Sequence, residues 1–135
     1  IVRDLLRKTW IDEKGCQMLL ADAKENIIVV APYNAQVQLI RAKLDSAGFS
    51  QIPVGTVDKF QGQQAAVAIV SMTASSAMDV PRGIEFLFMP NRLNVAISRA
   101  KWAAYLLYSP ALLDYRPTNG DNLRLLSKFL NLVGV

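Results

Sequence analysis

Short apolar runs rich in β-branched residues constrain the fold of this chain most. Residues 27–31 form one such run, and residues 67–72 form another. Neither run alternates apolar with polar residues, and this pattern is typical of strands covered on both faces in a parallel sheet. Helical patterns separate the runs, so the alternation predicts an α/β domain with a mainly parallel central sheet.

Local signals predict the remaining elements. Residues 52–57 and 103–108 are expected to be two further strands, the second of them buried, and residues 10–18 a small hairpin after a helix within residues 1–9. A helix over 35–47 is predicted to have Asn34 as its N-cap and Gly48 as a left-handed stop. Its expected buried stripe is Val37, Ile40, Leu44 and Ala47. A closing helix is expected to begin near residues 119–121 and to bury Leu123, Leu126, Phe129, Leu130 and Val133.

Two arginines mark a further helix, predicted to follow Pro90 with Asn91 as its N-cap. Its apolar stripe is expected to be Leu93, Ala96, Ile97 and Ala100. Arg92 and Arg99 are seven residues apart, so they should lie almost directly above one another on this helix. Two guanidinium groups so placed would repel each other unless an anion lies near them, and phosphate is the obvious candidate. The alternative is a pair of solvated surface arginines.

Composition narrows the class of protein. The 135 residues fit a single domain, and 52% hydrophobic with 19% charged residues suit a compact fold. The net charge of +4 permits an anionic partner such as nucleic acid without indicating a basic tail. With no histidine and only Cys16, the chain offers neither a Cys/His metal site nor an internal disulfide. No apolar run is long enough to span a membrane and no signal-peptide pattern is present, so we expect a cytoplasmic protein.

Polar loops follow the predicted strands, where ligands of such sheets gather. Pro32, Tyr33 and Asn34 follow the first strand, where they could face a phosphate or a base, although simple N-capping also explains Asn34. Residues 55–64 combine a hydroxyl, a carboxylate, a lysine and three glutamines, which could bond to sugar and phosphate. The long connection over residues 73–91 is expected to be a functional loop, although its Phe86-Leu87-Phe88 could equally be core.

Three segments together resemble a known family. The segments V-V-A-P-Y-N-A-Q, G-T-V-D-K-F-Q-G-Q-Q and N-R-L-N-V-A-I-S-R-A-K are similar to motifs IV, V and VI of superfamily I helicases. The similarity is to the branch that contains the RNA-surveillance and Okazaki-fragment-processing helicases. It covers roughly residues 25–110 and implies the second RecA-like motor domain of such an enzyme, with a three-layer fold like that of P-loop NTPases.

The resemblance also implies roles for individual residues. Arg99 would be the arginine finger that reaches the γ-phosphate of ATP held by the first motor domain. Arg92, Gln61, Gly62 and Gln64 would lie near the nucleotide. Thr56 and the turn Pro32-Tyr33-Asn34 would contact single-stranded DNA or RNA. Similar segments occur in bacterial proteins with a RecB-like nuclease domain, which makes such a domain a further expected partner.

Two departures from the family pattern shape the functional expectation. The family usually has a glutamate where this chain has Gln64, which can form hydrogen bonds but carries no charge. The chain also lacks a G-x-x-x-x-G-K-[ST] phosphate loop and an acidic pair for Mg²⁺. We therefore expect a fragment of a larger ATP-dependent helicase, covering residues 1–135 as one domain and inactive alone. The alternative is a non-catalytic module that docks nucleic acid or protein. A nuclease is disfavoured because the sequence offers no carboxylate-and-lysine metal cluster.

Overall fold

Parallel strands form the central sheet in a computed structural model, which describes residues 1–72, 88 and 90–134. The strand order is β4-β3-β5-β6. The strands are β3 (Ile27–Val30), β4 (Val54–Gly55), β5 (Ala65–Ser71) and β6 (Ala100–Leu107). Ile27 lies opposite Val67 and Val29 lies opposite Val54, both in parallel register. The prediction of an α/β domain with a parallel sheet is confirmed.

Both faces of the central strands β3 and β5 are buried, as their unbroken apolar runs predict. Successive side chains of a strand point to opposite faces. In β3, Ile28 and Val30 belong to one core cluster, whereas Ile27 and Val29 belong to the other. All four of these residues are at most 5% exposed. The sheet therefore separates two cores, and each core needs a covering layer.

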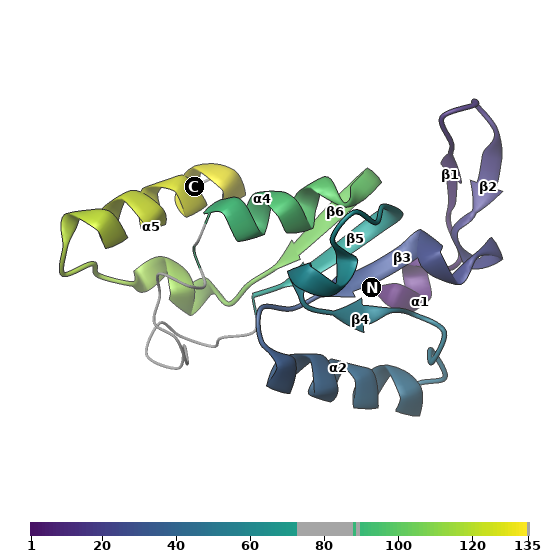
Figure 1. The fold of residues 1–135 in the computed structure, drawn as a ribbon, viewed down its shortest axis with the longest axis horizontal. Helices are drawn as coiled ribbons and strands as arrows, with labels where there is room; N and C mark the ends of the chain where they lie inside the picture. The colour runs from purple at the N-terminus through teal and green to yellow at the C-terminus, as the bar shows by residue number, and fades with distance from the viewer. Residues whose placement is uncertain (73–87, 89, 135) are drawn as a thin grey trace.

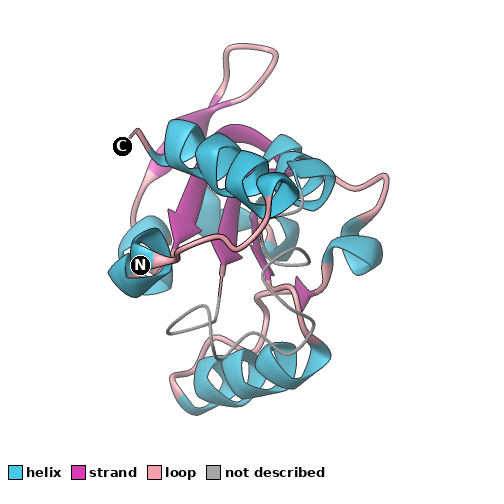
Figure 2. Cartoon of the chain, turned by 90° about the vertical axis from the view of Figure 1, so that its left-hand side faces the viewer, coloured by secondary structure: helices cyan, strands magenta, loops and turns pink. Residues whose placement is uncertain are grey.

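Helices supply these two layers, which gives a three-layer RecA-like fold (Figures 1 and 2). One face packs against α1 (Val2–Leu5), α2 (Asn34–Ser46) and the hairpin of β1 (Thr9–Ile11) and β2 (Gln17–Leu19). The other face packs against α4 (Pro90–Ser98) and α5 (Gly120–Val133). Short 3-10 helices complete the chain: η1 (Leu20–Asp22), η2 (Lys24–Asn26), η3 (Val57–Phe60) and η5 (Pro110–Asp114).

Cap predictions had mixed outcomes. Gly48 has φ +86° directly after α2, so the left-handed stop is confirmed. Asn119 caps α5 by accepting a hydrogen bond of 2.8 Å from the Asn122 N–H, as expected. The prediction that Asn34 caps α2 is wrong, because Tyr33 is the N-cap and Asn34 is the first helical residue. Ala47 and Leu123 are exposed, so neither belongs to its predicted buried stripe.

Two strands differ from their predicted form. β4 has only two residues, because Val57 belongs to η3 instead of the strand. β6 begins three residues earlier than expected and is not buried; Trp102 in it is 46% exposed. The reason is that β6 lies at the edge of the described sheet, so only β5 pairs with it there. An apolar run alone does not reveal whether its strand is central or at an edge.

The helix α4 begins at Pro90, so the prediction that Asn91 is its N-cap is wrong. Proline is favoured at the first helical position, because the N–H that it lacks would have no helical partner there. Three members of the predicted stripe are confirmed, with Leu93 and Ala96 buried and Ile97 packed against the same core. The fourth, Ala100, is wrong as a helical residue, because it begins β6. Of the long connection before α4, the structure describes only Phe88, which is 1% exposed and stacks on Phe129 with ring centroids 4.7 Å apart. The expectations for the other residues of this connection lie outside the described residues.

In the described residues, no helix combines the length and apolar character needed to cross a membrane.

Candidate functional site

The helix α4 runs along the sheet from one end of its strands to the other. At its start, Arg92 lies with Ser71 and Met72, where β5 ends. Just beyond its last residue, the carbonyl of Arg99 accepts a hydrogen bond of 2.8 Å from the N–H of Ala65, where β5 begins. Arg92 is therefore at the carboxyl end of the strands and Arg99 at the amino end.

A hollow of about 280 Å³, here called the arginine hollow, lies between η3 and α4. It is lined by Val57, Asp58, Gln61, Asn91, Arg92, Val95 and Arg99. Both arginines thus border one cavity, which agrees with the prediction that they lie on the same side of the helix. The only acidic side chain among these lining residues is Asp58, so the formal charge of the lining is two positive and one negative. Such a lining favours an anion.

Two backbone carbonyls hold the Arg99 side chain. Its Nε donates to the carbonyl of Val95 at 3.2 Å, and its Nη1 donates to the carbonyl of Gln63 at 3.4 Å. Val95 lies in the last turn of α4, where carbonyls lack helical partners and a cation interacts favourably with the helix dipole. A guanidinium has five N–H donors, and the bonds to described residues use two of them. The remaining donors are available to a ligand in the hollow.

A tight turn places the Gln63 carbonyl. The N–H of Gln63 donates to the carbonyl of Phe60 at 3.0 Å, Gln61 has φ −58° and ψ 127°, and Gly62 has φ +75°. These values define a type II β-turn, in which the third residue needs a positive φ and is therefore usually glycine. Phe60 is 1% exposed and anchors the turn in the core. The positive φ that this turn requires therefore explains why position 62 is a glycine.

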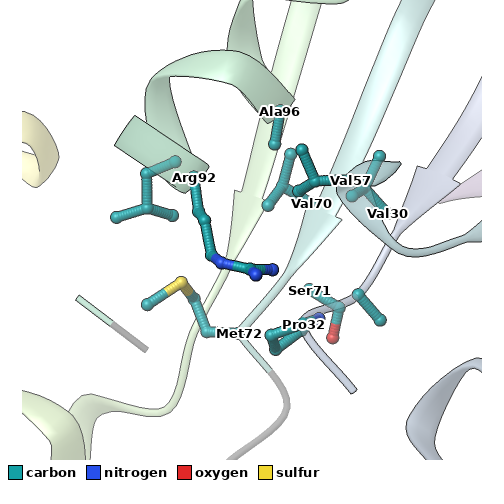
Figure 3. A pocket seen from close by; sticks show the side chains of 10 residues that line it. Val30, Pro32, Val57, Val70, Ser71, Met72, Arg92 and Ala96 are labelled. Carbon is teal, nitrogen blue, oxygen red and sulfur yellow. The ribbon is translucent and has the colours of Figure 1, made fainter. Parts of the chain in front are cut away.

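A second, much smaller hollow lies at the carboxyl end of the strands (Figure 3). This strand-end hollow has a volume of about 30 Å³ and is lined by the ends of β3 and β5 with residues of α4. Its lining is Val30, Ala31, Pro32, Val57, Val70, Ser71, Met72, Arg92, Leu93 and Ala96. Arg92 therefore borders both hollows. In Figure 3 its guanidinium points toward Ser71 and Pro32.

Comparison with known proteins identifies the family. Residues 3–110 match the family model described as an AAA domain. The chain belongs to this family of superfamily I helicases. It lies in the branch of the RNA-surveillance helicases, as the three motifs predict.

Named relatives cover most of this helicase domain. RNA helicase Mov10l1 of Homo sapiens is 37% identical over 108 residues, which is 70% of this chain and 9% of the human protein. DNA polymerase alpha-associated DNA helicase A of Schizosaccharomyces pombe is 47% identical over 77 residues, covering 57% of this chain and 11% of that protein. A Drosophila melanogaster regulator of nonsense transcripts 1 homolog is 35% identical over 95 residues, with coverages of 66% and 8%. The chain thus spans about a tenth of the length of these relatives.

The helicase domain brings together some of the predicted site residues but not all. Arg92, Arg99 and Gln61 share the arginine hollow, with Gly62 in the adjoining turn. Gln64 is exposed and lines neither hollow.

The predicted strand contacts lie toward the other end of the helicase domain. Pro32 lines the strand-end hollow, and Tyr33 packs against the core beneath it. Asn34 is exposed at the start of α2, and Thr56 is half-buried between β4 and η3. Neither Asn34 nor Thr56 lines the hollows described here.

Sequence reasoning counted Asp58 only as the carboxylate of the polar loop over residues 55–64, whereas the helicase domain places it beside both arginines in the arginine hollow. A signal was present, since residues three apart in a 3-10 helix lie on the same side and Asp58 precedes Gln61 by three. Lys59 is the opposite case. Its Nζ donates to the carbonyl of Val54 at 2.8 Å, so this lysine braces the end of β4 instead of facing the hollow.

Proposed function

We propose that this chain is the second RecA-like motor domain of an ATP-dependent helicase or translocase that moves on single-stranded DNA or RNA. The observation that carries the proposal is the pose of Arg99, held by two carbonyls on the wall of the 280 Å³ arginine hollow. In this role, Arg99 is the arginine finger for ATP bound by the first motor domain. Gln61, Gly62 and Gln64 are proposed to assist on the nucleotide side, and the resemblance adds Arg92 to them.

The chemistry of the arginine hollow supports a phosphate ligand. Guanidinium groups form strong, charge-assisted bonds to phosphate oxygens, and a preorganised donor stabilises charge that develops in the transition state. Mg²⁺ needs several oxygen ligands, and Asp58 is the only carboxylate in this lining. The residues therefore fit the phosphate tail of ATP and not the metal. We infer that the first motor domain binds most of the nucleotide and the Mg²⁺, because this sequence has no phosphate loop.

The proposed mechanism is a clamp. ATP between the two motor domains draws Arg99 toward the γ-phosphate and closes the domains, and hydrolysis releases them. Alternating grip on the strand by the two domains then becomes directed movement. Pro32, Tyr33, Asn34 and Thr56 are the proposed strand contacts of this domain. The names of the relatives include both an RNA helicase and a DNA helicase, which supports a nucleic-acid track of either kind. A RecB-like nuclease domain and a cytoplasmic location also belong to the proposal.

The test compares the isolated chain with its parent protein. Purified residues 1–135 should fold but show no strand-stimulated ATP turnover above background. The parent protein should hydrolyse ATP when single strand is added, and Arg99→Ala should abolish most of that turnover. Steady turnover by the isolated chain, or normal turnover by the Arg99→Ala parent, would refute the proposal.

A second candidate is a non-catalytic docking module that keeps the helicase fold. The exposed position of Gln64, away from both hollows, favours it slightly, because the expected nucleotide-side carboxylate is missing there. The same measurement separates the candidates, since a docking module would bind its partner without ATP turnover in the parent.

A further inference from the structure

The side chain of Lys59 caps the outer edge of β4. The carbonyls of Pro53 and Gly55 each accept a hydrogen bond of 3.0 Å from backbone N–H groups of β3 and of the residue after it. Because successive carbonyls of a strand point to opposite sides, the carbonyl of Val54 faces away from β3. In the described sheet, no strand lies on that side of β4. The Nζ of Lys59 donates to this carbonyl at 2.8 Å and so takes the place of a strand partner.

Gly55 leaves room for the stem of this lysine. A Cβ added at Gly55 would lie 2.3 Å from Cδ and 2.9 Å from Cβ of Lys59, far inside van der Waals contact. The φ of Gly55 is not positive, so the backbone alone would accept another residue there. The close approach of the lysine stem is what requires a glycine, since a side chain at position 55 would displace it. Lys59 is therefore held by its stem as well as by its ammonium group.

Hydrogen bonds lead from Lys59 to Arg99. The backbone carbonyl of Lys59 accepts a bond of 3.4 Å from Nε2 of Gln63. The carbonyl of Gln63 in turn accepts a bond of 3.4 Å from Nη1 of Arg99. The N–H of Ala65 donates to the carbonyl of Arg99 at 2.8 Å, so the same segment holds both the main chain and the side chain of this arginine. An unbroken series of contacts thus joins the edge of the sheet to the guanidinium group.

A small shift in this series would matter for catalysis. A catalytic donor must lie within about 0.5 Å and 10–20° of its productive position, and neighbours that contact no substrate maintain this geometry. The Gln63 carbonyl is one of the two that orient the guanidinium of Arg99. The turn that carries this carbonyl directly follows η3, which the bond from Lys59 fastens to β4.

We propose that Lys59 is a positioning residue for ATP turnover, which ties η3 to β4 and thereby orients Arg99 through the Gln63 carbonyl. This inference rests on the proposed function, because it requires Arg99 to act on the nucleotide. In this role, Lys59 contacts neither ATP nor the strand. The competing role is a direct bond from its ammonium group to a phosphate of the strand, which would require the bond to Val54 to break.

The experiment replaces Lys59 in the parent protein, both alone and together with Arg99. Lys59→Met removes the N–H donors but keeps an unbranched stem over Gly55, and Lys59→Arg keeps donors of similar reach. Lys43→Met, at an exposed lysine in the last turn of α2, is the matched control. Turnover is measured per strand-binding site, so a misfolded fraction does not lower it, and single-turnover measurements give the rate of the Arg99→Ala protein. Strand binding is measured with thymidine and uridine homopolymers at several salt concentrations.

We expect Lys59→Met to lower kcat about tenfold, with the KM for ATP and the strand affinity within about twofold of wild type. Lys59→Arg should recover most of this loss, and Lys43→Met should match wild type. In the Arg99→Ala protein, Lys59→Met should have no further effect, because its influence passes through Arg99.

Three results would overturn the inference and leave the proposed function intact. The first is an unchanged kcat of the Lys59→Met protein. The second is an equal loss with and without Arg99→Ala, as a merely structural lysine would give. The third is weaker strand binding with a salt slope flatter by about 0.7, which would assign Lys59 to a strand phosphate. If Arg99→Ala itself leaves turnover unchanged, the proposed function fails, and this inference fails with it.

Discussion

The two ends of α4 carry the same type of side chain in very different surroundings. At the carboxyl end of the strands, Arg92 borders a small hollow with mainly apolar walls, and its guanidinium points toward Ser71 and Pro32 (Figure 3). At the amino end, backbone carbonyls of Val95 and Gln63 bond to the guanidinium of Arg99. A backbone carbonyl fixes the direction of the N–H groups that donate to it, whereas apolar walls hold a side chain in place without orienting its N–H groups. The comparison shows that neighbours, and not residue type, decide how firmly each guanidinium is oriented.

The largest expected effect is on ATP turnover, and it comes from replacing Arg99. In the parent protein, Arg99→Ala should lower maximal ATP turnover by roughly 1,000- to 100,000-fold, the range for arginine fingers in phosphoryl transfer. Arg99→Lys should remain clearly impaired, because an ammonium lacks the planar fork that reaches two oxygens at once. The measurement is ATP turnover at saturating single strand, with thermal unfolding of each variant as the check on folding.

Lys101 provides the control for this prediction. The structure pairs its Nζ with Glu13 at 3.4 Å, instead of leaving it as a solvated charge. An exposed ion pair contributes little to stability, so Lys101→Ala should change turnover only a few-fold. The finger assignment would be contradicted by a folded Arg99→Ala protein with turnover close to that of the Lys101→Ala protein.

The next largest effect is on stability, and it tests the apolar contacts that hold α4 against the sheet near Arg92. Leu93 is 7% exposed in α4, and Leu93→Ala should lower the free energy of unfolding of the chain by about 2 to 4 kcal/mol through lost burial and a cavity. Leu39 is 60% exposed in α2, so Leu39→Ala should change this free energy by less than about 0.5 kcal/mol. Urea unfolding of both variants checks the difference. Equal effects would mean that Leu93 does not hold α4 against the sheet.

Salt concentration should affect strand binding and ATP turnover to different extents. With about three phosphate contacts, the isolated domain should lose roughly ten- to twenty-fold in affinity for single strand between 50 and 200 mM salt. In the parent protein at saturating strand, the same salt change should affect ATP turnover much less, because the Arg99 end is held by backbone bonds. Tight strand binding that does not respond to salt would contradict the proposed contacts.

The smallest expected effect comes from replacing Gly62, and it tests whether the position of the Gln63 carbonyl matters for ATP turnover. Gly62 has φ +75° and Gly15 has φ +78°, and a Cβ added at either would meet open space. Each alanine variant should therefore destabilise the chain by a similar amount, about 1 to 2 kcal/mol. Only Gly62→Ala should also slow ATP turnover of the parent, by a few-fold, because it disturbs the turn beside Arg99. Asn at position 62 should restore much of this loss, since asparagine tolerates positive φ. If the two alanine variants have equal ATP turnover, the turn at residue 62 does not influence the candidate site.

Much of the fold could be predicted because its signals are local. The unbroken apolar run of β3, the glycine after α2 and the asparagine before α5 each encode their structure within a few residues. The errors arise where the structure of an element depends on neighbours that are distant in the sequence. The exposure of β6 depends on its place at the sheet edge, and the shortness of β4 depends on η3 turning back toward the core.

The candidate site shows the same limit. The spacing of Arg92 and Arg99 predicted that both would lie on one side of the helix, and both border the arginine hollow. The direction of each guanidinium could not be predicted, because it depends on β3, β5 and the Q-G-Q turn, which lie elsewhere in the sequence. The place of Asp58 beside the arginines was missed for a related reason. Its spacing of three from Gln61 is informative only if residues 57–60 are known to form a 3-10 helix, which the sequence did not reveal.

The straight course of α4 between the two hollows has a mechanical consequence. An α-helix of nine residues resists compression, because every turn is braced by hydrogen bonds along its axis. Leu93 and Ala96 fasten this rod to the sheet at its middle. The two ends of the helix are thereby held at a fixed separation along its axis. One end therefore cannot change position unless the whole helix moves against the sheet and the contacts of Leu93 and Ala96 break.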